Sequence, residues 1–181
     1  HLSPVFLMKE DEDTDSPTST AIIEQVSKTC EAVFVMEPAE AQTNAQKTER
    51  KGVGRFDIEV TGKSAHEGNH HEDGVNAIVE IAKLIVKLEG LTDYERGTTV
   101  NVGTIRGGST SNVVPEKAII EVDFRVTSAE EGRRIEEIFE SLTAEDDRVS
   151  LSIKGGINRL PLEKNDKNKQ LFEIAKRTGE K

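Results

Sequence analysis

The 181-residue chain has very little cysteine and few long apolar stretches. Its one cysteine, Cys30, excludes an internal disulfide and any zinc site built on cysteine pairs. No run of about 18 apolar residues occurs, which excludes a hydrophobic membrane-spanning helix. No signal peptide is recognisable either. Together with the single cysteine, this leads us to expect a cytoplasmic location.

Basic and aromatic residues are also scarce. The chain carries 24 Lys and Arg against 34 Asp and Glu, a net charge of −10, and aromatic residues make up only 4%. Nucleic-acid binding depends on a basic face, so the charge argues against DNA or RNA as a partner. Apolar residues at 34% suffice for a core of Val, Ile and Leu. At roughly 100–200 residues per domain, the length allows one domain or one and a half.

Between about residues 54 and 155 the hydrophobic pattern predicts four strands and two helices. Apolar and polar residues alternate over 56–60, 100–103, 120–126 and 149–153, which is typical of strands with one buried face. Helical spacing follows Asp73, a candidate N-cap, and follows Ser128, which forms a capping box with Glu131. The order β-α-β-β-α-β predicts an α+β, ferredoxin-like sandwich: a four-stranded antiparallel sheet with two helices on one face.

The sequence near the two ends of the chain predicts strands and helices of a second, incomplete α/β layer. Residues 4–8 and 32–36 are short apolar runs that we interpret as buried strands. Between them a helix is predicted, with Ser16 as N-cap and Pro17 at its first position. Residues 166–178 predict a further helix. The first 50 residues therefore resemble part of an α/β layer rather than a complete fold.

Carboxylates follow both apolar runs of the N-terminal segment. Glu12 and Asp13 belong to an acidic cluster after the first run, and Glu37 follows the second. Carboxylates at strand ends can bind a metal or act as a general base, and parallel strands bring such ends to one edge of a sheet. The alternative is that Glu12 and Asp13 belong to a solvated acidic loop and that Glu37 is a helix-cap or surface acid.

Three residues of the central region are candidates for binding an anion. His66 follows a predicted strand between small residues and can donate a hydrogen bond. Arg125, on the polar face of a predicted strand, is either a clamp for a carboxylate or half of a cross-strand ion pair. Asn112 is either a ligand-binding amide or a turn residue.

Four segments together resemble one known family. Residues 53–66 (VGRFDIEVTGKSAH), 73–78 (DGVNAI), 99–115 and 121–125 (EVDFR) are similar to the lid, or dimerisation, domain of the M20 family of zinc metallopeptidases. The nearest branch is that of the carboxypeptidase G2-like glutamate carboxypeptidases. The lid of that family has the same β-α-β-β-α-β order that the periodicity predicts.

The resemblance assigns roles to six residues. It implies that Glu12 is the general base and that Asp13 and Glu37 each bind one of two zinc ions. It implies that His66 reaches across a homodimer to the oxyanion. Asn112 and Arg125 would hold the terminal carboxylate of a peptide or N-acyl amino acid. The implied reaction is hydrolysis of the amide bond before a C-terminal, glutamate-like residue.

The chain departs from the family in its metal ligands. Asp13 stands where the family has Glu, and the His-x-Asp motif, the bridging Asp and the late His have no counterpart. We therefore expect a fragment that is inactive alone. It comprises a catalytic remnant at 1–52, the lid at 53–157 and the start of a second catalytic segment at 158–181. The alternatives are a non-catalytic dimerisation module and an anion-binding ferredoxin-like module that uses His66 and Arg125.

Overall fold

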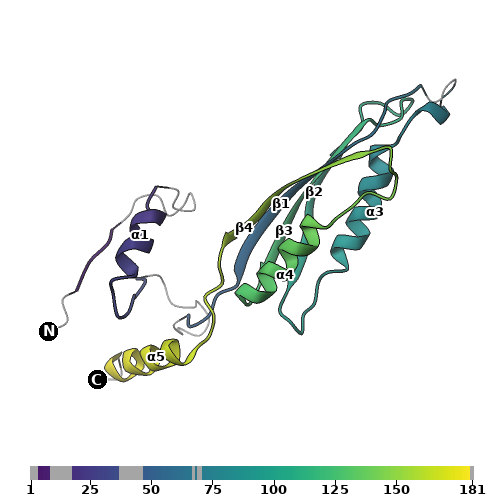
Figure 1. The fold of residues 1–181 in the computed structure, drawn as a ribbon. Helices are drawn as coiled ribbons and strands as arrows, with labels where there is room; N and C mark the ends of the chain where they lie inside the picture. The colour runs from purple at the N-terminus through teal and green to yellow at the C-terminus, as the bar shows by residue number, and fades with distance from the viewer. Residues whose placement is uncertain (1–3, 9–17, 37–46, 67, 69–70, 180–181) are drawn as a thin grey trace. The chain divides into compact units, whose positions relative to one another are not determined.

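The computed structural model describes residues 4–8, 18–36, 47–66, 68 and 71–179 (Figure 1). The chain divides into two units. One comprises His1–Gln46 with Gln170–Lys181, and the other is Lys47–Lys169. The four strands found in the described part of the chain all belong to the second unit, which also holds the buried core.

The sheet is antiparallel throughout. Its strands are β1 (Gly52–Thr61), β2 (Thr99–Gly107), β3 (Lys117–Val126) and β4 (Ser150–Arg159). They lie side by side in the order β2-β3-β1-β4, so β2 and β4 form the edges. Antiparallel pairing of β1 with both β3 and β4, and of β2 with β3, confirms the predicted ferredoxin-like topology.

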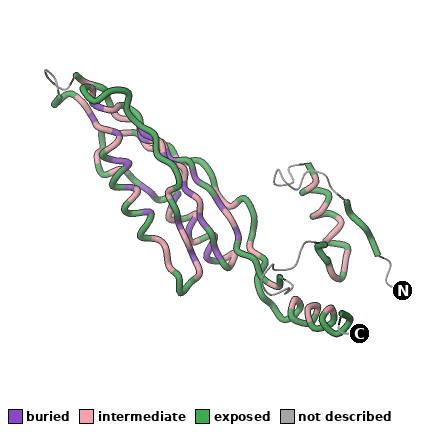
Figure 2. The backbone as a smooth tube through the Cα atoms, turned by 180° about the vertical axis from the view of Figure 1, so that it is seen from behind, coloured by how far each residue is buried: buried purple, intermediate pink, exposed green. Residues whose placement is uncertain are grey.

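Two helices cover one face of this sheet. Helix α3 (Ala77–Glu89) packs on β1, β2 and β3, and helix α4 (Ala129–Glu140) packs on β3 and β4. Side chains alternate between the faces of a strand. The even-numbered residues of β3 from Ala118 to Val126 are accordingly buried, whereas Arg125 is exposed. Figure 2 shows buried positions, in purple, along the strands and along the helices that cover them.

Phenylalanines join α4 to the sheet. Phe139 of α4 stacks on Phe56 of β1 with ring centroids 4.2 Å apart, and Phe56 stacks on Phe124 of β3 at 5.7 Å. All three rings are almost completely buried. Gly54 makes room for one of them, because a Cβ there would lie 2.1 Å from Cζ of Phe124.

Helix α3 begins three residues later than a cap at Asp73 predicts. Its N-cap is Asn76, whose side chain accepts hydrogen bonds from the backbone N–H groups of Ile78 and Val79. Val75 forms an antiparallel bridge with Lys63, which keeps residue 75 extended and prevents an earlier start. Asp73 instead ends the short 3-10 helix η2 (His71–Asp73).

Half of the predicted capping box at α4 is present. The Ser128 hydroxyl accepts a hydrogen bond from the Glu131 N–H at 3.1 Å. The buried Glu131 carboxylate contacts Arg134 and, at 3.8 Å, Arg96. The contact with Arg134 holds the pKa of Glu131 below its usual value.

The prediction of buried strands at 4–8 and 32–36 is wrong. Neither run is a strand, and Phe6 and Phe34 are 84% and 62% exposed. A strand requires a hydrogen-bonded neighbour, and none of the described residues pairs with either run. Helix α1 (Thr20–Ser27) lies between them, while its predicted start at Ser16 and Pro17 falls outside the described residues.

The helix predicted near the C-terminus is confirmed as α5 (Asp166–Gly179). Among the described residues, no helix has both the length and the apolar content that crossing a membrane requires.

Candidate functional site

Two of the predicted site residues lie together at one end of the sheet. Beyond β1 the chain continues beside the loop that leads into β3. The Gly62 N–H donates to the Glu116 carbonyl at 2.7 Å, and the Val114 N–H donates to the Ala65 carbonyl at 2.9 Å. His66 then forms an antiparallel bridge with Val113. The segment that carries His66 therefore lies directly against the loop that carries Asn112.

One ring nitrogen of His66 already has a partner. The Gly68 N–H donates to Nδ1 of His66 at 3.3 Å. Because Nδ1 accepts this bond, the neutral imidazole carries its proton on Nε2. The side chain is exposed, so Nε2–H is available to an oxygen of a ligand.

The amide of Asn112 is oriented in a similar way. The Thr110 hydroxyl donates to Oδ1 of Asn112 at 2.8 Å. This leaves the NH₂ group of the exposed Asn112 as a donor. His66 and Asn112 thus both present N–H groups, which suits an oxyanion or a carboxylate.

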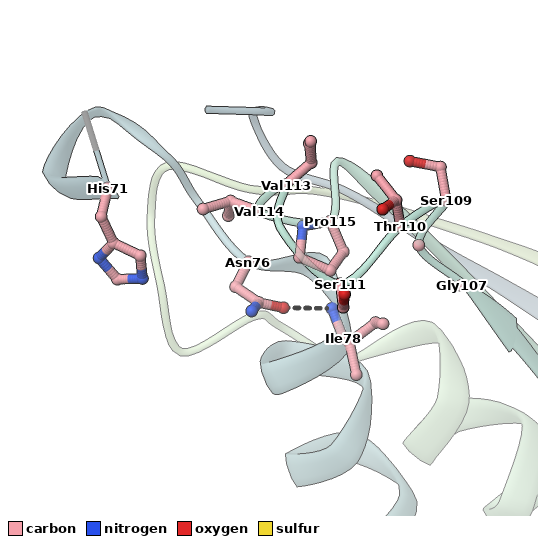
Figure 3. Close-up of a pocket in the computed structure, with 11 residues that line it drawn as sticks. His71, Asn76, Ile78, Gly107, Ser109, Thr110, Ser111, Val113, Val114 and Pro115 are labelled. Atoms are coloured by element: carbon pink, nitrogen blue, oxygen red, sulfur yellow. Dashed lines mark hydrogen bonds between the residues drawn. The ribbon is translucent and has the colours of Figure 1, made fainter. Parts of the chain in front are cut away.

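A cavity of about 470 Å³ lies beside the same loop (Figure 3). Its polar lining includes Ser109, Thr110 and Ser111 from the loop, His71 of η2, and Asn76, the N-cap of α3. Ile78 and Pro115 provide part of its apolar wall. The hydrophobic pattern does not predict this cavity, although the Ser-Thr-Ser run between a Gly pair and a Pro indicates a polar loop at this position.

Arg125 lies at the opposite end of β3. Lys117 pairs with Thr61 at the end near Asn112, whereas Arg125 pairs with Val53 and Thr99 at the other end. At about 3.3 Å per residue, residues 117 and 125 are about 26 Å apart. The structure therefore brings His66 and Asn112 together but does not bring Arg125 to them.

Arg125 belongs to a row of ion pairs on the exposed face of the sheet. Its Nε donates to Oδ1 of Asp123 at 2.9 Å, within the strand rather than across to a neighbour. Further pairs on the sheet are Arg55–Asp57, Arg55–Glu121, Arg106–Glu121 and Lys117–Glu59. Exposed pairs of this kind contribute little to stability, typically about 0–1 kcal/mol each.

The predicted metal-site residues, Glu12, Asp13 and Glu37, lie outside the described residues. Within the described ranges, no cluster of three or more His, Cys, Asp or Glu side chains could hold a metal ion. A catalytic zinc site uses about three protein ligands per metal. Asp13 and Glu37, even with Glu12, do not fit a two-zinc centre by themselves.

Comparison with known proteins identifies the central region. Residues 48–149 match the family model described as the peptidase dimerisation domain of the M20 type. Carboxypeptidase G2 from Pseudomonas sp. (strain RS-16) is 28% identical over 125 residues, which are 69% of this chain and 30% of that protein.

Two solved structures share the fold. Aminopeptidase PepT from Bacillus cereus has a TM-score of 0.63 at 25% identity, over 74% of this chain and 36% of that one. YXEP from Bacillus subtilis, described as a dinuclear metal-binding peptidase of the M20 family, has a TM-score of 0.51 at 18% identity, over 71% and 32%. The chain thus spans about a third of the length of these hydrolases.

Proposed function

Because the chain belongs to the family of M20 peptidase dimerisation domains, we propose that it is the dimerising lid of a zinc-dependent amide hydrolase. The proposed substrate is a peptide or N-acyl amino acid, cleaved before a C-terminal, glutamate-like residue. Residues 53–157 are the lid in this proposal. Residues 1–52 and 158–181 belong to catalytic segments, and the location is cytoplasmic.

The bridge between His66 and Val113 is the observation that carries the proposal. It places two exposed N–H donors, those of His66 and Asn112, at one end of a rigid sheet. Preorganised donors stabilise the negative oxygen that develops when an amide carbonyl is attacked. We assign His66 to that oxyanion and Asn112 to the substrate carboxylate.

Arg125 can bind the same substrate carboxylate as Asn112 only if the two residues come from different copies of the chain. It lies about 26 Å along β3 from the end that carries Asn112, so one carboxylate cannot contact both residues of one chain. In a homodimer, His66 and Asn112 of one protomer can face the site that the partner's Arg125 serves. The separation therefore supports a site shared between protomers.

The surface formed by α3 and β2 is suited to pairing two copies. Val79 and Val86 of α3 are 51% and 77% exposed, and Ile105 of β2 is 54% exposed. Strand β2 is an edge of the sheet, and no strand among the described residues pairs with its outer side. An exposed apolar side chain on an edge strand, as at Ile105, favours association, and the exposed valines of α3 add to the apolar surface of the domain.

Glu12 remains the proposed general base, and Asp13 and Glu37 the proposed zinc ligands. Since these donors do not make up a two-zinc centre, the remaining ligands have to come from outside the 181 residues. The activity is accordingly assigned to a longer chain that includes them.

Complementation between two inactive variants tests the proposal. In the longer chain, His66→Ala and Glu12→Ala are each expected to abolish hydrolysis of an N-acyl glutamate. A 1:1 mixture that has exchanged subunits is expected to regain about a quarter of the wild-type activity. Half of its dimers are mixed, and each mixed dimer has one intact site of two.

A mixture of two preparations of His66→Ala is the matched control and is expected to stay inactive. If the heterologous mixture also stays inactive after verified exchange, His66 does not act across the dimer. If the longer wild-type chain dimerises without hydrolysing any N-acyl amino acid or peptide, the chain is a non-catalytic association module.

A further inference from the structure

The outer edge of β2 has two halves with different hydrogen bonding. β2 pairs with β3 on one side only, so every second backbone N–H and C=O points away from the sheet. Such groups can pair with another chain. In the first half of β2, side chains of its own chain already bind them.

Thr92 and Glu89 supply these bonds. The Thr92 hydroxyl accepts from the Val100 N–H at 3.0 Å and donates to the Val100 carbonyl at 3.1 Å, as a neighbouring strand would. A carboxylate oxygen of Glu89, the last residue of α3, accepts from the Val102 N–H at 2.7 Å. Strand pairing is therefore blocked at residues 100 and 102.

A register shift separates this half from the second. Val102 pairs with Val122, but Thr104 pairs with Glu121, so Gly103 is an extra residue. Beyond it, the Gly108 N–H donates inward to the Lys117 carbonyl at 3.1 Å. Alternation then directs the backbone groups of Ile105 and Gly107 outward. Among the described residues, none bonds to these groups from the outer side.

The open half lies next to the apolar surface of α3. Gly107 lies against Ile78 of α3, since a Cβ there would be 3.0 Å from that side chain. Ile105 pairs with the core residue Ile120, so its side chain is on the face that α3 covers, and it is 54% exposed. Four residues of strand are too short for a stable interface alone, and the exposed side chain of Ile105 adds apolar area at this edge.

We propose that Glu89 and Thr92 confine strand pairing between two copies of this chain through the β2 edge to Thr104–Gly107. This inference rests on the proposed dimerising function and adds a determinant of register. An edge that is free along its whole length can slip by two residues or recruit further chains. Two side-chain caps at one end of β2 leave a single four-residue segment of that edge open, which fixes how a second copy pairs there.

Amide hydrogen exchange on the wild-type chain, measured by NMR at concentrations below and above dimer formation, tests the inference. Dimer formation is expected to slow exchange of the Ile105 and Gly107 amides. Exchange at Val100 and Val102 is expected to be independent of concentration. Residue-level exchange also separates this surface from any association through the exposed apolar residues of the first 50.

A pair of double variants tests the caps themselves. Glu89→Ala with Thr92→Val removes both caps, whereas Glu89→Gln with Thr92→Ser keeps an acceptor and a hydroxyl. In the monomer of the uncapped variant (Glu89→Ala with Thr92→Val), the Val102 amide is expected to exchange roughly tenfold faster than in the wild type. The uncapped variant is also expected to form species larger than a dimer in sedimentation velocity. The second is expected to remain a discrete dimer with wild-type exchange.

The outcomes distinguish this inference from the proposed function. A wild-type chain that stays monomeric at millimolar concentration overturns both. A dimer whose formation also protects Val100 and Val102, or leaves Ile105 and Gly107 unprotected, overturns the inference and leaves dimerisation standing. An uncapped variant that forms the same discrete dimer as wild type, with unchanged exchange at Val102, also overturns it.

Discussion

At the scale of single residues, the tautomer of His66 depends on one backbone group. The Gly68 N–H donates to Nδ1, which leaves the proton on Nε2. Gly68→Pro removes this donor. With about 1 kcal/mol for a typical hydrogen bond, the ratio of the two neutral tautomers is expected to shift about fivefold toward Nδ1–H. The imidazole ¹⁵N chemical shifts measure this ratio directly.

Gly68→Ala is the matched control for that experiment. It keeps the N–H, and its Cβ would lie 3.6 Å from Cε1 of His66, an ordinary contact. The alanine variant is expected to keep the wild-type tautomer. Equal ratios in all three proteins would show that the Gly68 N–H does not set the tautomer.

A second prediction at this scale concerns the pKa of Asp146. Its carboxylate accepts from Nη2 of Arg148 at 2.7 Å and from Nε at 3.0 Å, which lowers its pKa from 3.8 to about 2. A pKa depressed in the folded state means that this interaction stabilises the fold above pH 3.8. The contribution is lost as the pH falls toward 2.

Arg148→Ala is expected to raise the pKa of Asp146 toward 3.8, though not fully, because the backbone N–H of residue 148 also donates at 3.0 Å. A pH titration of the side-chain ¹³C carboxyl shift measures the change. Arg148→Lys keeps the positive charge without the two-pronged contact. The pKa of Asp146 in this variant is expected to lie between its values in the wild type and in Arg148→Ala. An unchanged pKa in Arg148→Ala would contradict the assignment.

At the scale of elements, the N-cap of α3 provides a stability test. Asn76 accepts from two helical N–H groups at 2.9 and 3.1 Å. Asn76→Ala is expected to lower the free energy of unfolding by about 1 kcal/mol, measured by urea denaturation. Asn76→Asp retains the acceptor and is expected to stay close to wild type. Equal losses in both variants would assign the effect to something other than the cap.

The elements that the sequence predicts well are those with a regular hydrophobic period. Alternation around Phe56, Ile120 and Ile153 predicts strands and their buried face because packing against two helices imposes that period. It also predicts the end of β4 too early. β4 continues to Arg159 through Gly155 and Gly156, whose φ values of 143° and 148° and missing side chains interrupt the pattern.

Contacts between distant segments were less predictable. The start of α3 depends on the bridge from Val75 to Lys63, which no local propensity reveals. The proximity of His66 to the Asn112 loop, and the distance of Arg125 from both, follow from strand register. The apolar runs at 4–8 and 32–36 have strand-like composition but no described neighbour, so composition alone misled the prediction.

At the scale of the whole molecule, we expect the 181-residue chain to bind almost no zinc, because it has too few metal ligands. Asp13 and Glu37 cannot satisfy a two-zinc centre, which needs about three protein ligands per metal. Elemental analysis of the purified chain, after dialysis against trace zinc, is therefore expected to find near zero zinc per chain.

The double variant Asp13→Asn with Glu37→Gln separates a designed site from incidental binding. Partial zinc that persists in this variant would be held elsewhere in the chain. About two zinc ions per wild-type chain, lost in the double variant, would contradict the prediction. It would mean that other residues of the chain complete the centre, and the 181-residue chain would then itself be expected to hydrolyse N-acyl amino acids.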